Sequence, residues 1–167
     1  MKLIKLTALP LFIFITLLVL ASCEPDAELK KTVDYQRLDI PMTGAQETPP
    51  VTTSALGSMD VAYSKSTKFL TYTVRWSGLS GPVSAMHIHG QATAGYPAAV
   101  FQNIITSSGG ITTPSATRFP ATGTFSANLL VDGVTVKEND LLNGFYYINI
   151  HTAAFPGGEI RGQIKFQ

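Results

Sequence analysis

Three histidines are the residues of this chain best suited to binding a metal ion, and all three fall in segments where polar and apolar residues alternate. His87 and His89 lie two positions apart, and His151 lies much later in the chain. Residues two positions apart on a β-strand point to the same face, with Cα atoms about 6.5–7 Å apart. Because metal–nitrogen bonds are about 2.0–2.1 Å long, two such imidazoles can approach one ion. The pattern therefore predicts a candidate site for copper or zinc.

The residues around His151 indicate how a third imidazole could join the first two. His151 shares its predicted strand face with Asn149, whereas Ile148 and Ile150 would face the core. A neighbouring strand can thus supply the third imidazole, and Glu159 is the nearest candidate for a fourth ligand. The alternative is a polar hydrogen-bonded cluster that ties strand ends to loops, since three scattered histidines are less specific than a fixed metal-binding motif.

A second dense group of polar residues follows at positions 156–162, which read P-G-G-E-I-R-G. The Pro-Gly-Gly segment predicts a tight turn that leads into the last strand. Glu159 and Arg161 share a face of that strand, so we expect a structural ion pair between them or with groups on neighbouring strands. Such a pair stabilises little where it is exposed.

Period-two alternation runs through most of the chain after residue 34 and predicts half-buried β-strands. Turn-forming residues separate the alternating segments, which is typical of an all-β sandwich or barrel. Residues 92–120 are rich in Gly, Pro, Ser and Thr and predict a long loop with one short strand. Residues 138–143 predict a helical turn. The clearest alternating segments are Leu38–Met42, Gly57–Tyr63, Leu70–Trp76, Gly123–Leu129 and Ile160–Phe166.

The N-terminus carries the features of an export signal. Lys2 and Lys5 precede an apolar run at residues 6–21, which is shorter than the about 20 apolar residues that cross a bilayer. Residues 20–23 read L-A-S-C and resemble the bacterial lipobox, in which the cysteine receives lipid and becomes the new N-terminus. We expect lipidation of Cys23, the only cysteine. An ordinary secretory signal peptide is the alternative.

These features divide the chain into three parts. Residues 1–22 are the expected lipoprotein signal peptide, residues 23–34 a polar, flexible tether after the lipidated cysteine, and residues 35–167 one β-domain. The expected location is the cell envelope, with the lipid holding the protein on a membrane at the periplasmic or the cell-surface side. Because one cysteine cannot form a disulfide within the chain, packing alone has to stabilise the domain.

Composition excludes some classes of function and disfavours others. Without the signal peptide the chain is near neutral and has no basic run, so the sequence offers no electrostatic driving force for nucleic-acid binding. It has no G-x-S-x-G motif and no cysteine nucleophile within the β-domain, and nothing predicts a pair of carboxylates at glycosidase spacing. We therefore expect a non-enzymatic protein.

Four segments resemble the CHRD domain, named from chordin, and together they span almost all of residues 38–166. They read G-A-Q-E-T-P-P-V from position 44, A-M-H-I-H-G from 85, Y-I-N-I-H-T from 147 and P-G-G-E-I-R-G-Q-I from 156. The matching positions include Gln46, Glu47, Pro49, Pro50, His87, His89, Gly90, Asn149, His151, Thr152, Gly157, Gly158, Glu159, Arg161 and Gly162.

The resemblance implies an antiparallel, immunoglobulin-like (Greek-key) β-sandwich of the kind found in secreted proteins, including bacterial lipoproteins. It assigns no biochemical activity. We expect a lipid-anchored binding or structural module that contacts an unidentified protein or glycan through its loops. The alternative is a mononuclear copper or zinc domain, with or without redox chemistry. Three histidines and one cysteine are too few for the dinuclear site and disulfide of copper/zinc superoxide dismutase, which the His-x-His pattern partly resembles.

Overall fold

Antiparallel β-strands make up most of the structure, a computed structural model that describes residues 33–106 and 119–167. Every strand pair is antiparallel, and the strands follow the order β5-β4-β7-β8-β1-β2-β3-β6 in one sheet. The prediction of an all-β antiparallel fold is confirmed. The elements are β1 (Tyr35–Thr43), the 3-10 turn η1 (Gly44–Gln46), β2 (Leu56–Tyr63), β3 (Phe69–Ser77), β4 (Val83–Gly90), β5 (Val100–Ile105), β6 (Gly123–Leu130), α1 (Glu138–Leu142), β7 (Tyr146–Thr152) and β8 (Ile160–Gln163).

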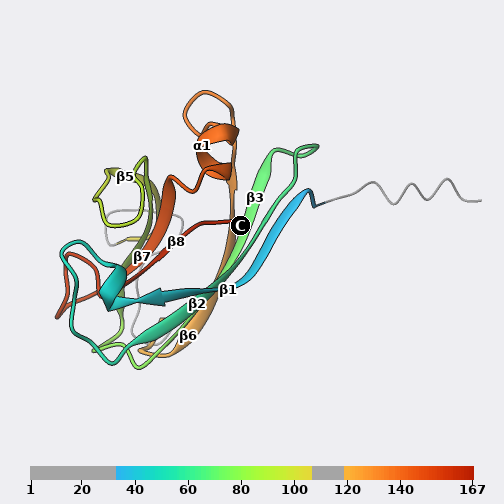
Figure 1. Cartoon of the computed structure of the whole chain (residues 1–167). Helices are drawn as coiled ribbons and strands as arrows, with labels where there is room; N and C mark the ends of the chain where they lie inside the picture. The colour runs from blue at the N-terminus through green and yellow to red at the C-terminus, as the bar shows by residue number, and fades with distance from the viewer. Residues whose placement is uncertain (1–32, 107–118) are drawn as a thin grey trace, which may run out of the picture. The chain divides into compact units, whose positions relative to one another are not determined.

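The sheet curls into a half-barrel, with β5-β4-β7-β8 on one side and β1-β2-β3-β6 on the other (Figure 1). One bridge, between Thr43 and Arg161, joins the two halves within the sheet. At the other end the side chain of Gln102 on β5 connects them: it accepts a hydrogen bond from the Tyr72 hydroxyl (3.1 Å) and donates one to the Asn128 carbonyl (3.3 Å). The strand pairing does not by itself confirm the immunoglobulin-like Greek-key sandwich.

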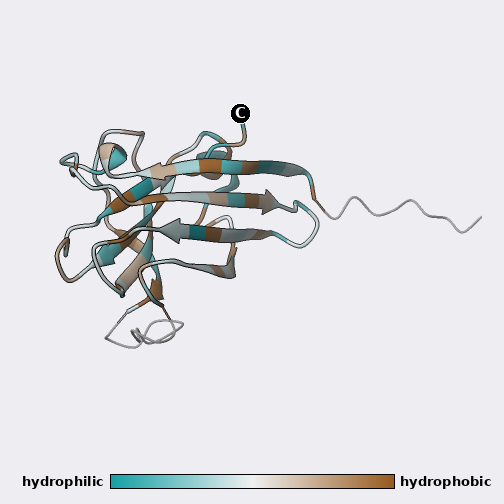
Figure 2. Cartoon of the chain, turned by 90° about the horizontal axis from the view of Figure 1, so that it is seen from below, coloured by the Kyte–Doolittle hydropathy of each residue, from teal (hydrophilic) through white to brown (hydrophobic). Residues whose placement is uncertain are grey.

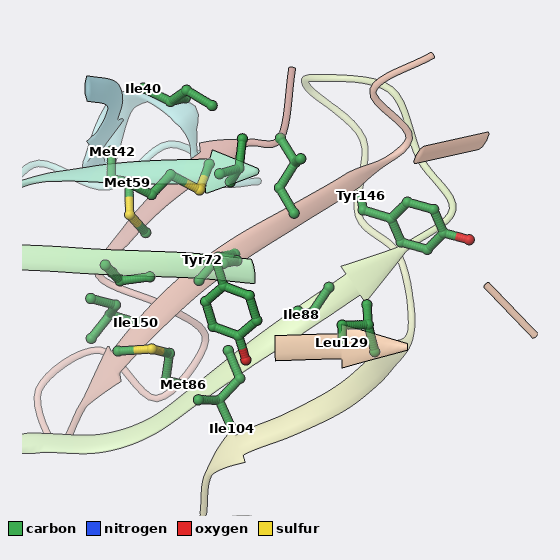
Figure 3. Close-up of a cluster of buried hydrophobic side chains, with 14 of the residues drawn as sticks. Ile40, Met42, Met59, Tyr72, Met86, Ile88, Ile104, Leu129, Tyr146 and Ile150 are labelled. Carbon is green, nitrogen blue, oxygen red and sulfur yellow. The ribbon is translucent and has the colours of Figure 1, made fainter. Parts of the chain in front are cut away.

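The hydrophobic core fills the inside of the curl, because each strand turns alternate residues inward. On β3 the inward residues Leu70, Tyr72 and Val74 are buried, while Thr71 and Arg75 on the other face of the strand are exposed. This alternation is visible as teal and brown bands along the strands in Figure 2. Figure 3 shows how side chains from both halves pack together, among them Ile40, Met42, Met59, Tyr72, Met86, Ile88, Ile104, Leu129, Tyr146 and Ile150.

The outward side chains of β4, β7 and β8 form a polar face that loops cover. Gln163 on β8 donates to the Ala92 carbonyl at 2.9 Å. Arg161 donates to the Tyr96 carbonyl at 3.0 Å and to the Thr48 hydroxyl at 3.3 Å. The loops at residues 45–50 and 91–98 thus bury polar side chains that an open sheet would leave in water.

The signal peptide predicted at residues 1–22, Cys23 and most of the tether at residues 23–34 lie outside the described residues. Their assignments stay predictions. Within residues 33–106 and 119–167, no helix has the length and apolar composition needed to cross a bilayer.

Candidate functional site

The three histidines meet on the polar face, near the centre of one half of the sheet. His87 and His89 point outward from β4, while Met86 and Ile88 between and before them are fully buried in the core. Pairing of β4 with β7 places Asn149 opposite His87. His151 lies two residues further along β7. The predicted orientation of the His87–His89 pair is therefore confirmed.

The ring nitrogens converge on one point. His87 Nδ1 lies 3.0 Å from His151 Nε2. Asn149 Oδ1 lies 2.9 Å from His151 Nε2 and 3.0 Å from His89 Nε2. One ligand atom from each of the three histidines lies within 4.8 Å of the others. Since bonds of about 2.0–2.1 Å in a tetrahedral site put ligand atoms about 3.3 Å apart, small side-chain movements bring these atoms to metal-binding distances.

Backbone carbonyls fix the tautomers of two of the imidazoles. His89 Nδ1 lies 2.9 Å from the Ala98 carbonyl, and His151 Nδ1 lies 2.9 Å from the Pro156 carbonyl. A carbonyl oxygen only accepts hydrogen bonds, so in both rings the hydrogen of a neutral imidazole is on Nδ1. Each Nε2 therefore carries a lone pair, and both lone pairs face Asn149 Oδ1, which is itself an acceptor.

Burial keeps the imidazoles neutral. Together with the neighbouring His151 and His89, which have smaller effects, it lowers the pKa of His87 to about 4. Burial also lowers the pKa of His89 and of His151, although hydrogen bonds to Ala98 and Pro156 oppose the shift. At neutral pH the three rings therefore have no positive charge and keep lone pairs for a cation. A metal ion binds histidine in this neutral form.

Tyr147 on β7 holds the ring of His89 in place. The two rings are stacked, with centroids 4.7 Å apart and planes 1° from parallel. The Tyr147 hydroxyl accepts a hydrogen bond from the Ala98 backbone N–H at 3.1 Å, next to the carbonyl that orients His89. The Arg161 guanidinium carbon lies 3.4 Å from the centre of the same tyrosine ring. His89 therefore has little freedom to rotate, which suits a ligand.

Glu159, the predicted fourth ligand, is not among the residues that meet at this point. Its carboxylate is buried and accepts four hydrogen bonds, at 2.7–2.9 Å, from the Thr53 hydroxyl, the Thr152 hydroxyl and the Ser80 hydroxyl and backbone N–H. The predicted ion pair of Glu159 with Arg161 is wrong as well, because none of the ion pairs in the described ranges includes either residue. Asn149 Oδ1, and not an oxygen of Glu159, is the side-chain oxygen that lies beside the imidazole nitrogens.

Glu47 approaches the site from the covering loop at residues 45–50. Burial raises the pKa of its carboxyl to about 7, opposed by the Arg161 charge and by hydrogen bonding to Asn149 and the Thr48 backbone. Its Oε1 is buried and has no hydrogen-bond partner within the described part of the chain. Gly158 has a φ of +123°, which side chains disfavour, and a Cβ atom there would overlap this oxygen. Both the backbone conformation and the lack of space therefore require glycine.

The other residues of the CHRD-like motifs support the structure around the site. Gln46 donates to the Pro41 carbonyl at 2.9 Å, in the loop that also contains Pro49 and Pro50. A Cβ atom at Gly90 would overlap the Tyr146 ring, and one at Gly162 would lie 2.6 Å from Met42 Cγ. Gly157 has open space around its Cα. Thr152 belongs to the hydrogen bonds of Glu159.

Sequence reasoning placed Asn149 on the face of His151 but did not give it a role at the centre of the cluster. The signal was present: Asn149 and His151 have the same two-residue spacing as His87 and His89. The carbonyls of Ala98 and Pro156 left no signal, because any residue type supplies a carbonyl.

Comparison with known proteins gives one match. The CHRD domain family model matches residues 38–164, which is most of the chain and includes every residue of the site. No curated protein and no solved structure matches the chain.

Proposed function

From the premise that the chain belongs to the CHRD domain family, we propose that it is a lipid-anchored binding module of the cell envelope that holds one copper or zinc ion between His87, His89 and His151. The family itself suggests a binding or structural module. The metal ion is the ligand that the geometry of the polar face supports best. An unidentified protein or glycan that contacts the covering loops belongs to the same proposal.

One observation carries the proposal: acceptors face acceptors at a buried point. The lone pairs of His89 Nε2 and His151 Nε2 both point at Asn149 Oδ1, at 3.0 and 2.9 Å. Buried acceptors that face each other repel. His87 Nδ1 can donate to His151 Nε2 at 3.0 Å, but His89 Nε2 still faces the Asn149 oxygen. A cation at their centre converts this repulsion into coordination.

The type of donor atom favours copper or zinc over harder ions. Three imidazole nitrogens and one amide oxygen suit zinc, copper and other late transition metals, whereas calcium and magnesium prefer sites made of oxygen atoms. The three histidines come from two adjacent strands, so the sheet fixes their spacing before the metal arrives. That preorganisation lowers the cost of binding.

The competing explanation is a cluster that is satisfied by hydrogen bonds alone. It requires the Asn149 amide to be turned, so that its NH₂ group donates to both imidazoles and its oxygen faces Glu47. Glu47 would then have to be protonated to donate to that oxygen. This arrangement binds no metal, so a metal titration distinguishes it from the proposal.

The test is metal binding by the full-length chain in detergent, purified without a histidine tag and stripped with a chelator. We expect calorimetry to give one zinc or copper ion per chain. Replacing His87, His89 or His151 by alanine is expected to weaken binding about 100-fold or more, and Thr73→Ala on the other half of the sheet to leave it unchanged. Weak, non-stoichiometric binding, or equal binding by all variants, would exclude the metal site.

The anchor needs its own experiment, since metal binding does not depend on it. In a bacterial host, we expect the wild-type chain to incorporate labelled fatty acid and to fractionate with membranes. Cys23→Ser is expected to lose both properties while it keeps the metal affinity of the wild type. Label on the serine variant would disprove lipidation at Cys23.

The immunoglobulin-like Greek-key architecture also belongs to the proposal. Two observations support it: a single bridge joins the two four-stranded halves, and both halves contribute side chains to one core between them. An experimental structure of the chain would test this topology directly.

A further inference from the structure

A cavity of about 400 Å³ lies beside the polar face, apart from the point where the histidines meet. Its walls come from the loop at residues 45–50, from Ala94 and Gly95 in the second covering loop, and from Arg161 and Gln163 on β8. Its volume falls in the range of small-molecule sites, about 300–1,000 Å³. No residue of the histidine cluster lines it.

Arg161 places a positive charge in the wall of this cavity. Its side chain is 1% exposed. Its guanidinium donates to three oxygens, those of the Thr48 hydroxyl, the Tyr96 carbonyl and the Gln163 side chain, at 3.3, 3.0 and 2.9 Å. All three oxygens are neutral, and so is the Tyr147 ring beneath the guanidinium.

The cation forms no direct ion pair in the described ranges, and the Glu47 carboxyl, partly protonated at neutral pH, is the acidic group that acts on it through space. Ion pairs there join Lys65 and Lys68 to Glu138 and Arg75 to Asp60, and none reaches Arg161. Glu47 lines the same cavity, but its Oε1 is turned toward Gly158. A buried charge without a directly paired carboxylate is costly, and a guanidinium presents a planar fork of N–H groups that fits a carboxylate.

We propose that this cavity binds a small organic carboxylate, with the carboxylate group at the Arg161 guanidinium and the hydrocarbon part against Ala45, Pro50 and Ala94. One cation in the wall matches one negative charge. The carboxyl group of Glu47 nearby disfavours a second negative charge, which makes phosphate a poor fit. The small side chains of Ala45, Ala94 and Gly95 leave the space that the body of the ligand needs.

The test uses the full-length chain in detergent, treated with chelator so that the histidine cluster holds no metal. Acetate, butyrate and benzoate are titrated at constant ionic strength, alongside acetamide, butyramide, benzamide and inorganic phosphate. We expect saturable binding of one carboxylate per chain, at least about tenfold tighter than that of its amide and of phosphate. Equal affinity for acid and amide, tighter binding of phosphate, or no saturable binding would each overturn the proposal.

Two variants in one loop locate the ligand. Ala94→Leu fills the cavity from an exposed position and is expected to weaken carboxylate binding about tenfold, whereas Ala99→Leu, also exposed but outside the cavity, is expected to leave it unchanged. Arg161→Lys keeps the charge but loses the fork, and we expect weaker binding there too. If the two leucine variants bind alike, the ligand lies elsewhere and the proposal is wrong. This outcome would not bear on the proposed metal site, because metal binding is measured in a separate experiment.

Discussion

Two buried polar groups lie on the same half of the sheet and differ in the balance of donors and acceptors. The Glu159 carboxylate accepts four hydrogen bonds, from Thr53, Ser80 and Thr152. In the histidine cluster, two imidazole lone pairs face the Asn149 oxygen. Both groups are buried, and both belong to the CHRD motifs. The metal-binding proposal depends on this difference in balance, because both groups are buried.

The pKa values of two carboxyl groups follow the same contrast. Burial would raise the pKa of Glu159, but the hydrogen bonds from Ser80, Thr152 and Thr53 outweigh it and hold the pKa below its ordinary value. For Glu47, burial outweighs the opposing effects of Arg161, Asn149 and Thr48 and raises the pKa to about 7. The first carboxyl is therefore charged and satisfied at neutral pH, and the second is partly protonated.

The largest effect on stability is expected when the Glu159 group is broken. Glu159→Ala removes the acceptor shared by the buried Thr152, by the half-buried Thr53 and by Ser80, and leaves a cavity in place of the buried carboxylate. We expect it to lower the free energy of unfolding by about 3–5 kcal/mol, measured by urea denaturation. Glu159→Gln keeps the shape and is expected to cost less. A loss below about 1 kcal/mol for the alanine variant would remove the contrast between the two groups.

Metal should stabilise the fold only where the histidine cluster is intact. At a free metal concentration 100 times the dissociation constant, binding raises the free energy of unfolding by about 2.7 kcal/mol. We expect this gain in the wild type and in Thr73→Ala, and its loss in His87→Ala, whose partly exposed side chain can be removed without opening the core. Differential scanning calorimetry with and without zinc measures it. The same gain in His87→Ala would contradict the proposed site.

A pH dependence is expected from Glu47. Its folded pKa of about 7 lies above its ordinary value of 4.5, so the native state keeps a proton that the unfolded chain releases between these values. The stability that this proton supplies is present below pH 4.5 and lost as the pH rises through 7. Glu47→Gln has no such loss, so we expect it to exceed the wild type by about 3 kcal/mol at pH 8 and to match it near pH 4.5.

Urea denaturation of both proteins across this pH range makes the comparison. Because the histidines are the same in both, their own titration cancels in the difference. A difference that does not change with pH would mean that Glu47 titrates near its ordinary value.

The smallest effect is expected on the exposed face of the other half of the sheet. The Thr73 and Ser126 hydroxyls are 2.8 Å apart on β3 and β6, in contact with solvent. Thr73→Ala is expected to change the free energy of unfolding by about 0.5 kcal/mol or less, because water replaces the lost hydrogen bond. A change as large as that of Glu159→Ala would show that exposure to solvent does not reduce the cost of losing a polar contact in this sheet.

The strands and the outward direction of the histidines could be predicted because they depend on local alternation. His87 with His89 and Asn149 with His151 follow the two-residue period, and the isoleucines between them are buried. The last alternating segment was predicted to reach Phe166, whereas β8 ends at Gln163. The short helix fell close to the predicted helical turn at residues 138–143.

The predicted Glu159–Arg161 pair was wrong for a reason that spacing cannot reveal. Glu159 lies just before β8 begins, and donors from three segments surround its carboxylate, two of them distant in the sequence. Arg161 lies within β8 and is covered by residues from two loops. Such long-range contacts decide partners, and the alternation of polar and apolar residues carries no information about them. The position of Glu47 beside Asn149 escaped prediction for the same reason.

The single bridge between Thr43 and Arg161 makes the junction of β1 and β8 the weakest line in the sheet. On its other side β1 pairs with β2 at seven positions, so β1 is held far more firmly there. We expect backbone amides along the β8 side of β1 to exchange with deuterium faster than those facing β2, since small local openings suffice to expose them. Arg161 belongs both to this junction and to the wall of the cavity, so a carboxylate bound there should slow that exchange.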